Sequence, residues 1–190
     1  MSMDNTHSLF EGHFVRLGPL DYEKDPPVVA RWTTDPLLHS LLGEVVRPLS
    51  VEAVRKMLEK VEKQMDETKD LFHFTLRARA DNRLVGLARI YSIDFHNGTG
   101  ALNLGIGDPS DRRRGYGSDS LNLLVRFGFD ELNLHRLSSL PSADSLPFIH
   151  MIEKAGFEEE ACMREACFHD GSYWDVIHMG LLRTKWEKKL

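Results

Sequence analysis

Residues 104–137 read LGIGDPSDRRRGYGSDSLNLLVRFGFDELNLHRL, and this stretch decides the fold class. An apolar segment, residues 99–107, leads into a polar loop with two glycines, and apolar residues then recur at helical spacing up to Phe129. A second apolar segment, residues 135–140, follows the helix. A strand, a helix and another strand in this order form a crossover, so the two strands are predicted to be parallel neighbours in one sheet.

The remaining elements follow from the same kinds of pattern. Strands are predicted at residues 13–20, 71–79, 83–93, 157–168 and 172–182, and helices at residues 28–33, from near residue 35, after the predicted N-cap Ser50, and at residues 145–155. Short turn-like breaks join most of the strands, which indicates antiparallel pairing. The predicted class is α+β: a mixed, mostly antiparallel central sheet with one parallel βαβ crossover, flanked by helices. Residues 1–190 are expected to form a single domain.

Composition and charge exclude several classes of protein. The net charge is −5 and the isoelectric point is about 6.0, so neither a nucleic-acid partner nor a membrane partner is expected. The sequence contains no apolar run long enough for a membrane span and no secretory signal pattern.

Cys162 and Cys167 lie too far apart along one predicted strand for a disulfide, so both are expected to be reduced, as in a cytoplasmic protein. The histidines and cysteines show no metal-ligand spacing, and no metal is expected.

The loop between the parallel strands has the chemistry of an anion site. Residues 112–118, RRRGYGS, combine two glycines, three arginines and the start of a helix. Glycine lets the backbone approach a ligand closely, and the first N–H groups of a helix are unpaired and carry partial positive charge. A pyrophosphate suits this arrangement. A plain glycine turn with solvated arginines explains the loop alone about equally well, and neither of the common glycine-rich nucleotide motifs is present.

The stretch 104–137 strongly resembles the signature of the GNAT acetyltransferases. Residues 153–182, EKAGFEEEACMREACFHDGSYWDVIHMGLL, resemble the C-terminal part of the subgroup that contains ribosomal-protein N-terminal and spermidine N-acetyltransferases. The resemblance implies acetyl-coenzyme A (acetyl-CoA) as cosubstrate, and homodimers are common in the family. It assigns the pyrophosphate to Arg112, Arg113, Arg114, Gly115, Tyr116, Gly117 and Ser118. It assigns the pantetheine amides to Leu104, Gly105, Ile106 and Gly107, in a form of strand addition.

The sequence departs from the family pattern at the expected catalytic positions. The family commonly has an asparagine at the start of the helix after the fifth strand and a tyrosine seven residues later, where this chain has Ser145 and Ile152. Ser145 is the one catalytic candidate; it suits contact with coenzyme A (CoA) and an N-cap about equally well. Ile152 cannot transfer a proton. The proton of the acceptor amine is expected to go to water or to one of the following side chains: Asp94, His96, Glu165, Asp175 and His178. Tyr173 and Trp174 either line the cleft or pack.

The predicted function is direct transfer of an acetyl group from acetyl-CoA to a primary amine. The acceptor is either a protein N-terminus or a small molecule. The alternative, motivated by Ile152, is a CoA-binding module without catalysis. Acidic residues lining the acceptor cleft would favour a polyamine, whereas an open groove between Glu44 and the last hairpin would favour a peptide.

Overall fold

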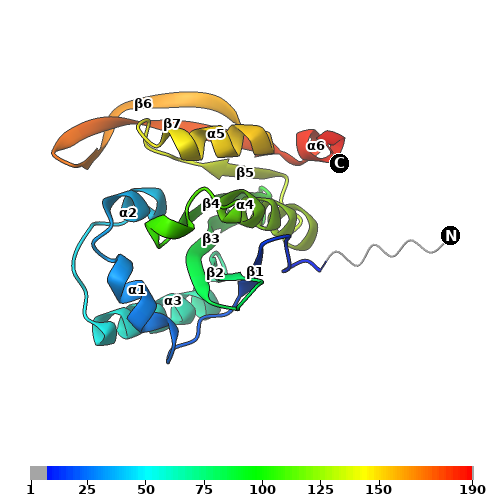
Figure 1. Cartoon of the computed structure of the whole chain (residues 1–190). Helices are drawn as coiled ribbons and strands as arrows, with labels where there is room; N and C mark the ends of the chain where they lie inside the picture. Colours follow the sequence, from blue (N-terminus) through cyan, green and yellow to red (C-terminus); the bar gives the residue numbers. More distant parts are fainter. Residues whose placement is uncertain (1–7, 190) are drawn as a thin grey trace.

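The computed structural model describes residues 8–189, which are built around one seven-stranded sheet (Figure 1). The strand order is β1-β2-β3-β4-β5-β7-β6. Every neighbouring pair is antiparallel except β4 and β5, which are parallel. The strands are β1 (Val15–Gly18), β2 (Phe72–Ala78), β3 (Leu84–Asp94), β4 (Thr99–Ile106), β5 (Arg136–Ser139), β6 (Glu158–His169) and β7 (Ser172–Leu182). The predicted α+β class and the single parallel crossover are confirmed.

Two groups of helices pack on the sheet and bury separate apolar clusters. The helices are α1 (Asp25–Trp32), α2 (Pro36–Leu42), α3 (Val51–Thr68), α4 (Tyr116–Arg126), α5 (Leu146–Ala155) and α6 (Arg183–Trp186), with short helical turns η1 (Pro109–Asp111), η2 (Phe127–Glu131) and η3 (Glu187–Lys189). Helices α1–α3 form one cluster with Leu87 of β3. Helices α4 and α5 form the other, larger cluster, with Ala88 and Ile90 of the same strand. Within residues 8–189, no helix is both long and apolar enough to cross a membrane.

The first helix corrects a prediction. The predicted helix began at Val28, after Pro26 and Pro27, but α1 begins at Asp25 and includes both prolines. The first N–H groups of a helix have no intrahelical partner, so proline there loses no hydrogen bond. Asp25 is buried and its carboxylate binds Arg77 of β2 at 2.8 Å, which fixes the start of the helix against the sheet.

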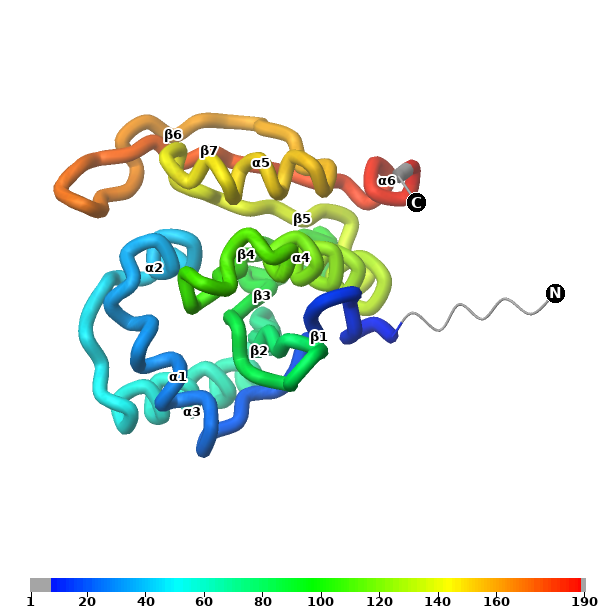
Figure 2. The backbone as a smooth tube through the Cα atoms, in the orientation of Figure 1, coloured from blue at the N-terminus to red at the C-terminus, as the bar shows by residue number. Residues whose placement is uncertain are grey.

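Strands β4 and β5 separate soon after they meet, and this divergence positions the site. Their pairing covers only Thr99–Ala101 with residues 136–138, whereas β4 continues along β3 as far as Ile106. The peptide N–H of Gly107 donates to Val85 O of β3 at 2.9 Å. Because peptide groups alternate sides along a strand, those of Leu104 and Ile106 point away from β3, toward the gap. In the view of Figure 2, β5 runs between α5 above it and α4 below it.

Candidate active site

A cavity of about 600 Å³ lies where β4 leaves β5. Its walls come from β4, the glycine loop, and helices α2, α4 and α5. The predicted site residues that line it are Leu104, Gly105, Ile106, Arg112, Arg113, Gly115, Gly117, Ser118 and Ser145. The fold therefore brings the two predicted parts of the CoA site, the strand and the loop, together with Ser145 around one space.

Three predicted residues do not line this cavity. Gly107 lies against Trp32, and a Cβ added there would come within 2.1 Å of the Trp32 ring. The Tyr116 side chain packs on the larger apolar cluster. The Arg114 side chain is exposed, 3.9 Å from Asp111. Sequence reasoning missed lining residues from α2, the loop and α5: Leu37, Leu41, Pro109, Pro147, Phe148 and Met151. Phe148 and Met151 belong to the apolar stripe of α5, which was visible in the sequence. No sequence pattern indicated that α2 would lie next to this cavity.

Arg112 is turned inward and has a structural role. Its guanidinium donates to the carbonyl oxygens of Ile106 (3.2 Å) and Gly107 (3.1 Å), and it pairs with the carboxylate of Asp35. The same carboxylate caps α2 by accepting from Leu38 N at 3.0 Å. Arg112 thus ties the start of α2 to the end of β4, and its charge is already paired. Arg113 and Arg114 carry the exposed guanidinium groups of the loop.

The glycine loop presents peptide N–H groups to the cavity. The first hydrogen bond of α4 runs from Asp119 N to Gly115 O at 3.0 Å, so the N–H groups of residues 116–118 precede the helical ladder. Gly115 (φ 86°) and Arg113 (φ 63°) both adopt the left-handed conformation that turns the chain back. A side chain in that conformation costs roughly 1 kcal/mol.

Ser145 does not cap α5 with its side chain. The residue is buried, and its carbonyl oxygen accepts from Phe148 N (2.9 Å) and Ile149 N (3.0 Å), but its hydroxyl makes no capping hydrogen bond. Of the two roles left open for Ser145, the side-chain cap is not formed, and the residue lines the cavity. Ile152 is fully buried in the larger apolar cluster, so that position offers an apolar contact and no proton.

Two of the predicted proton acceptors lie at the far end of the β3–β4 hairpin. The Asp94 carboxylate accepts from the N–H groups of Asn97 (3.0 Å) and His96 (2.9 Å) within the turn. These hydrogen bonds, that of Asn97 first, lower the pKa of Asp94 below its usual value. Asp94 pairs with Thr99, six residues from Gly105, so at about 3.3 Å per residue it is roughly 20 Å from the gap.

The other predicted acceptors belong to the last hairpin. The Asp175 carboxylate accepts from Glu165 N at 2.8 Å, at an irregular part of β6 where Glu165 has φ 50°. His178 pairs with Ala161 across β6 and β7. Glu165, Asp175 and His178 do not line the cavity at the gap. They also do not line the groove between α2 and the β6–β7 hairpin, which is described next. The structure thus gives Asp94 and Asp175 structural roles in turns and bulges.

A groove of about 640 Å³ runs between α2 and the β6–β7 hairpin. Glu44, Val45 and Val46 form one wall, and Phe168 and His169 belong to the other. The groove between Glu44 and the last hairpin, which would favour a peptide acceptor, is therefore present. Further lining residues are Tyr91, Leu140, Ser142, Met163, Cys167 and Asp170.

The aromatic residues of the hairpin support this wall from behind. Trp174 stacks on His169, with ring centroids 5.8 Å apart, and Tyr173 contacts Phe168 at 4.9 Å. Neither Tyr173 nor Trp174 lines the groove. Trp174 is partly buried and packs, whereas Tyr173 is exposed. Cys162 and Cys167 are free, as predicted. Within residues 8–189, no group of three or more His, Cys, Asp or Glu side chains is placed to hold a metal ion.

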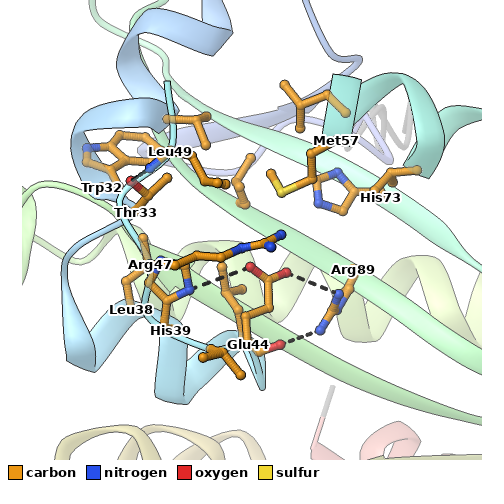
Figure 3. A pocket seen from close by; sticks show the side chains of 16 residues that line it. Trp32, Thr33, Leu38, His39, Glu44, Arg47, Leu49, Met57, His73 and Arg89 are labelled. Atoms are coloured by element: carbon orange, nitrogen blue, oxygen red, sulfur yellow. Dashed lines mark hydrogen bonds and ion pairs between the residues drawn. The ribbon is translucent and has the colours of Figure 1, made fainter. Parts of the chain in front are cut away.

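A second, inner cavity of about 450 Å³ lies between α1–α3 and the sheet (Figure 3). Its charged centre is Glu44, whose carboxylate is 3.7 Å from His39 Nδ1 and 3.6 Å from Arg89 Nη1. His39 and Glu44 also line the groove, so the two spaces meet at this pair. Deeper in the cavity, burial and then the charge of Arg89 lower the pKa of His73 to about 4. Nothing in the sequence pattern singled out His39.

Comparison with known proteins agrees with this geometry. Residues 15–158 match the family model of the acetyltransferase (GNAT) domain. The SPbeta prophage-derived uncharacterized N-acetyltransferase YokL of Bacillus subtilis is 30% identical over 155 residues, which cover 80% of this chain and 85% of that protein. The spermidine N(1)-acetyltransferase of Vibrio cholerae is 25% identical over 130 residues, which cover 64% of this chain and 75% of that protein.

Solved structures share the fold. The spermidine N-acetyltransferase from Vibrio cholerae in complex with CoA and spermine superposes with a TM-score of 0.78 at 21% identity, covering 91% of this chain and 98% of that one. A probable acetyltransferase superposes with a TM-score of 0.81 at 19% identity, covering 92% and 96% of the two chains. The family model spans most of this chain, and the chain therefore belongs to the GNAT family of N-acetyltransferases.

Proposed function

We propose that residues 1–190 form one acetyltransferase domain that transfers the acetyl group of acetyl-CoA directly to a primary amine. The observation that carries the proposal is the single cavity lined by both the glycine loop and the unpaired edge of β4. One end of this cavity suits a pyrophosphate, because unpaired N–H groups of a helix start face it. The other end suits an extended chain of amides, because the peptide groups of Leu104 and the N–H of Ile106 point into the gap, although Ile106 O already accepts from Arg112.

The strand edge supports the assignment of the pantetheine. Leu104 and Ile106 direct their peptide groups into the gap, where β5 no longer pairs with β4. Gly105 has no side chain, and a Cβ there would come within 2.3 Å of Leu38, so α2 can lie close over this part of the strand. The pantetheine would hydrogen-bond to Leu104 and Ile106 as an added strand and carry the thioester along β4.

The chemistry of the step is a direct displacement. The nitrogen lone pair of the amine attacks the thioester carbonyl, the C–S bond breaks, and the electron pair leaves on sulfur. A thiol with a pKa of about 8.5 departs as a thiolate near neutral pH, so the absence of a tyrosine at Ile152 does not prevent the reaction. Ser145 lines the cavity, and its hydroxyl would donate a hydrogen bond there. Cys162 and Cys167 lie on β6, outside this cavity, which supports transfer without a covalent enzyme intermediate.

The groove supports a protein N-terminus as the acceptor. It has exposed apolar side chains on both sides, including Val45 and Phe168, and its acidic members are Glu44 and Asp170. A polyamine carries several positive charges and would need several carboxylates along its length, whereas a peptide N-terminus carries one. Because one relative is named a spermidine acetyltransferase, a polyamine is the second candidate acceptor.

The test of the CoA site is a pair of substitutions at Gly117. A Cβ at this position would lie 3.2 Å from the flexible Met151 side chain, so Gly117→Ala should bind acetyl-CoA with nearly unchanged affinity in calorimetry. Gly117→Asp adds a negative charge next to the phosphates and should weaken binding by about 100-fold or more. Equal binding by the two variants would show that the loop does not hold the pyrophosphate.

Thiol release, measured with a panel of N-terminal peptides and polyamines, then identifies the acceptor. We expect turnover with peptides and little with spermidine or spermine. Tight acetyl-CoA binding with no turnover on any amine would favour the alternative, a CoA-binding module without catalysis.

A further inference from the structure

His39 is a buried side chain whose polar atoms lack hydrogen-bond partners. The residue lies in the last turn of α2 and is only 6% exposed. Neither Nδ1 nor Nε2 has a hydrogen-bond partner. Nδ1 is 3.7 Å from Glu44 Oε2, which is an ion-pair distance but too long for a hydrogen bond. Buried polar groups are normally paired, so an imidazole left free on both nitrogens points to a ligand.

The position of α2 brings His39 next to the gap. Leu37 and Leu41 of this helix line the CoA cavity, and His39 and Ser40 line the groove. The preceding residue, Leu38, packs over Gly105 of β4. Three residues beyond His39, the carbonyl oxygen of Leu42 accepts from Asn103 Nδ2 at 3.2 Å. His39 therefore belongs to the helix that covers this part of β4, and it lines both the groove and the inner cavity.

The other histidine of the groove is already engaged. His169 Nε2 is 3.2 Å from Ser142 Oγ and 3.3 Å from Asp144 Oδ1, and its Nδ1 is 3.6 Å from Asp170. These contacts tie His169 to the loop after β5 and engage its Nε2, whereas its Nδ1 has only the longer ion-pair contact with Asp170.

We infer that His39, oriented by Glu44, accepts the proton that the acceptor ammonium must lose before it attacks the thioester. This inference rests on the proposed function. The neutral imidazole would direct Nδ1–H toward Glu44 and leave the Nε2 lone pair free, because a neutral histidine has one donor and one acceptor nitrogen. An α-amino group has a pKa of about 8, so most of it is protonated at neutral pH and needs such a base.

The protons balance as follows. Nε2 takes one proton from the ammonium and passes it through the groove to solvent. The free amine attacks, the C–N bond forms, and the C–S bond breaks with its electron pair on sulfur. The nitrogen then loses its second proton, which compensates for the proton that the thiolate takes up. The products are an acetamide, CoA thiol and one proton in solution.

Glu44 is a positioning residue in this scheme, and Arg89 holds it. Figure 3 shows His39 and Arg89 on opposite sides of the Glu44 carboxylate. Arg89 is fixed by Asn103 Oδ1 at 3.0 Å and by the carbonyl oxygen of Leu42. The charged and titratable groups around His39 are Glu44, Arg47, Arg89 and His73 in the inner cavity and Tyr91, Cys167, His169 and Asp170 across the groove. Of these, Glu44 is the one that forms an ion pair with the His39 ring.

The test compares two identical substitutions in the same cavity. His39→Gln should retain acetyl-CoA binding in calorimetry and lower kcat with an N-terminal peptide by about 100-fold or more, the scale of a lost general base. His73→Gln, the matched control, should keep kcat within about threefold. The pH–rate profile separates a base from a structural residue: histidine changes charge between about pH 5 and 8, so wild-type activity should fall on the acid side. In His39→Gln that limb should disappear, and the rate should rise with pH until the amine itself is deprotonated.

Two further variants keep the test decisive. Glu44 is partly exposed, so Glu44→Gln should fold even if His39→Gln does not. It should lower kcat about tenfold and move the acid limb to lower pH, because the imidazolium loses its counter-ion. Added imidazole should partly restore His39→Ala. Wild-type kcat in His39→Gln, or an unchanged acid limb in Glu44→Gln, would overturn the inference while leaving the proposed function intact. A wild-type chain that binds acetyl-CoA but acetylates no amine would overturn both.

Discussion

At the scale of single residues, two serines that precede helices differ in what their side chains do. Ser50 Oγ accepts from Ala53 N at 3.2 Å and caps α3, whereas the hydroxyl of Ser145 caps nothing and the residue lines the cavity at the gap between β4 and β5. Both look alike in sequence, because each precedes a helical apolar stripe. The hydroxyl of Ser145 is free for a ligand because the backbone at this residue (φ −77°, ψ 46°) is not the extended conformation of a capping serine.

This difference gives a paired prediction. Ser50→Ala should lower the free energy of unfolding by about 1 kcal/mol, the usual cost of a lost cap, and should leave turnover unchanged. Ser145→Ala should leave the free energy of unfolding nearly unchanged and lower turnover about tenfold or less, the scale of one hydrogen bond. Urea unfolding and thiol-release kinetics on both variants check this. A marked loss of stability in Ser145→Ala would mean that its hydroxyl does cap α5.

At the scale of elements, a single carboxylate joins the helix of the glycine loop to the first strand. Asp119, in the first turn of α4, accepts from the peptide N–H groups of His13 (2.9 Å), Phe14 (2.7 Å) and Val15 (2.9 Å). The partners are more than 100 residues apart in sequence. An acidic residue in the first turn also suits the positive end of the helix. Asp119 thus fixes the position of α4, and with it the N–H groups of the loop.

Removing this carboxylate should loosen both elements. Asp119→Ala leaves three peptide N–H groups without their acceptor and should lower the free energy of unfolding by about 2–3 kcal/mol. The control is Asn122→Ala, an exposed change on the same helix, which should stay within about 0.5 kcal/mol. Denaturant unfolding measures both variants. Equal stabilities would show that water replaces the carboxylate without loss.

At the scale of the whole molecule, the inner cavity makes folding sensitive to acid. Burial, and then the charge of Arg89, lower the pKa of His73 from 6.5 to about 4. Between these values the unfolded chain binds a proton that the folded chain does not, so stability is full above about pH 6.5 and falls as the pH drops toward about 4. The free energy of unfolding should be about 2–3 kcal/mol lower at about pH 4.5 than at about pH 7 from this group alone.

The matched pair for this prediction is His73→Gln and His96→Gln. His73→Gln removes the titrating group from the cavity and should flatten the pH dependence of urea unfolding. His96 lies exposed in the β3–β4 turn, so His96→Gln should leave the dependence as in the wild type. Parallel pH profiles for the wild type and His73→Gln would show that another group controls the loss of stability in acid.

The sequence by itself determined most of the elements and singled out the glycine loop, because both depend on neighbours in the chain. Apolar periodicity depends on residues two to four apart, and it located β4 and β5 to within one residue at each end, whereas the predicted helix ran on to Phe129, in η2, beyond the end of α4 at Arg126. The glycine loop is visible in the sequence itself, because Gly115 and Gly117 stand directly after a run of three arginines. The absence of a phenol at Ile152 was inferred from the resemblance to the GNAT signature, and the structure buries this residue completely.

Only the tertiary structure decided which side chains face the acceptor. Asp94 and Asp175 carry the right chemistry in sequence, but turns and bulges use their carboxylates. His39 shows no pattern of its own, because its role depends on α2 lying over β4 and on Glu44 lying 3.7 Å away. Arg112 is drawn inward by Asp35, a residue 77 positions earlier in the chain. Such contacts join residues that are distant in sequence, so no local pattern contains them, and they form only when the helices pack on the sheet.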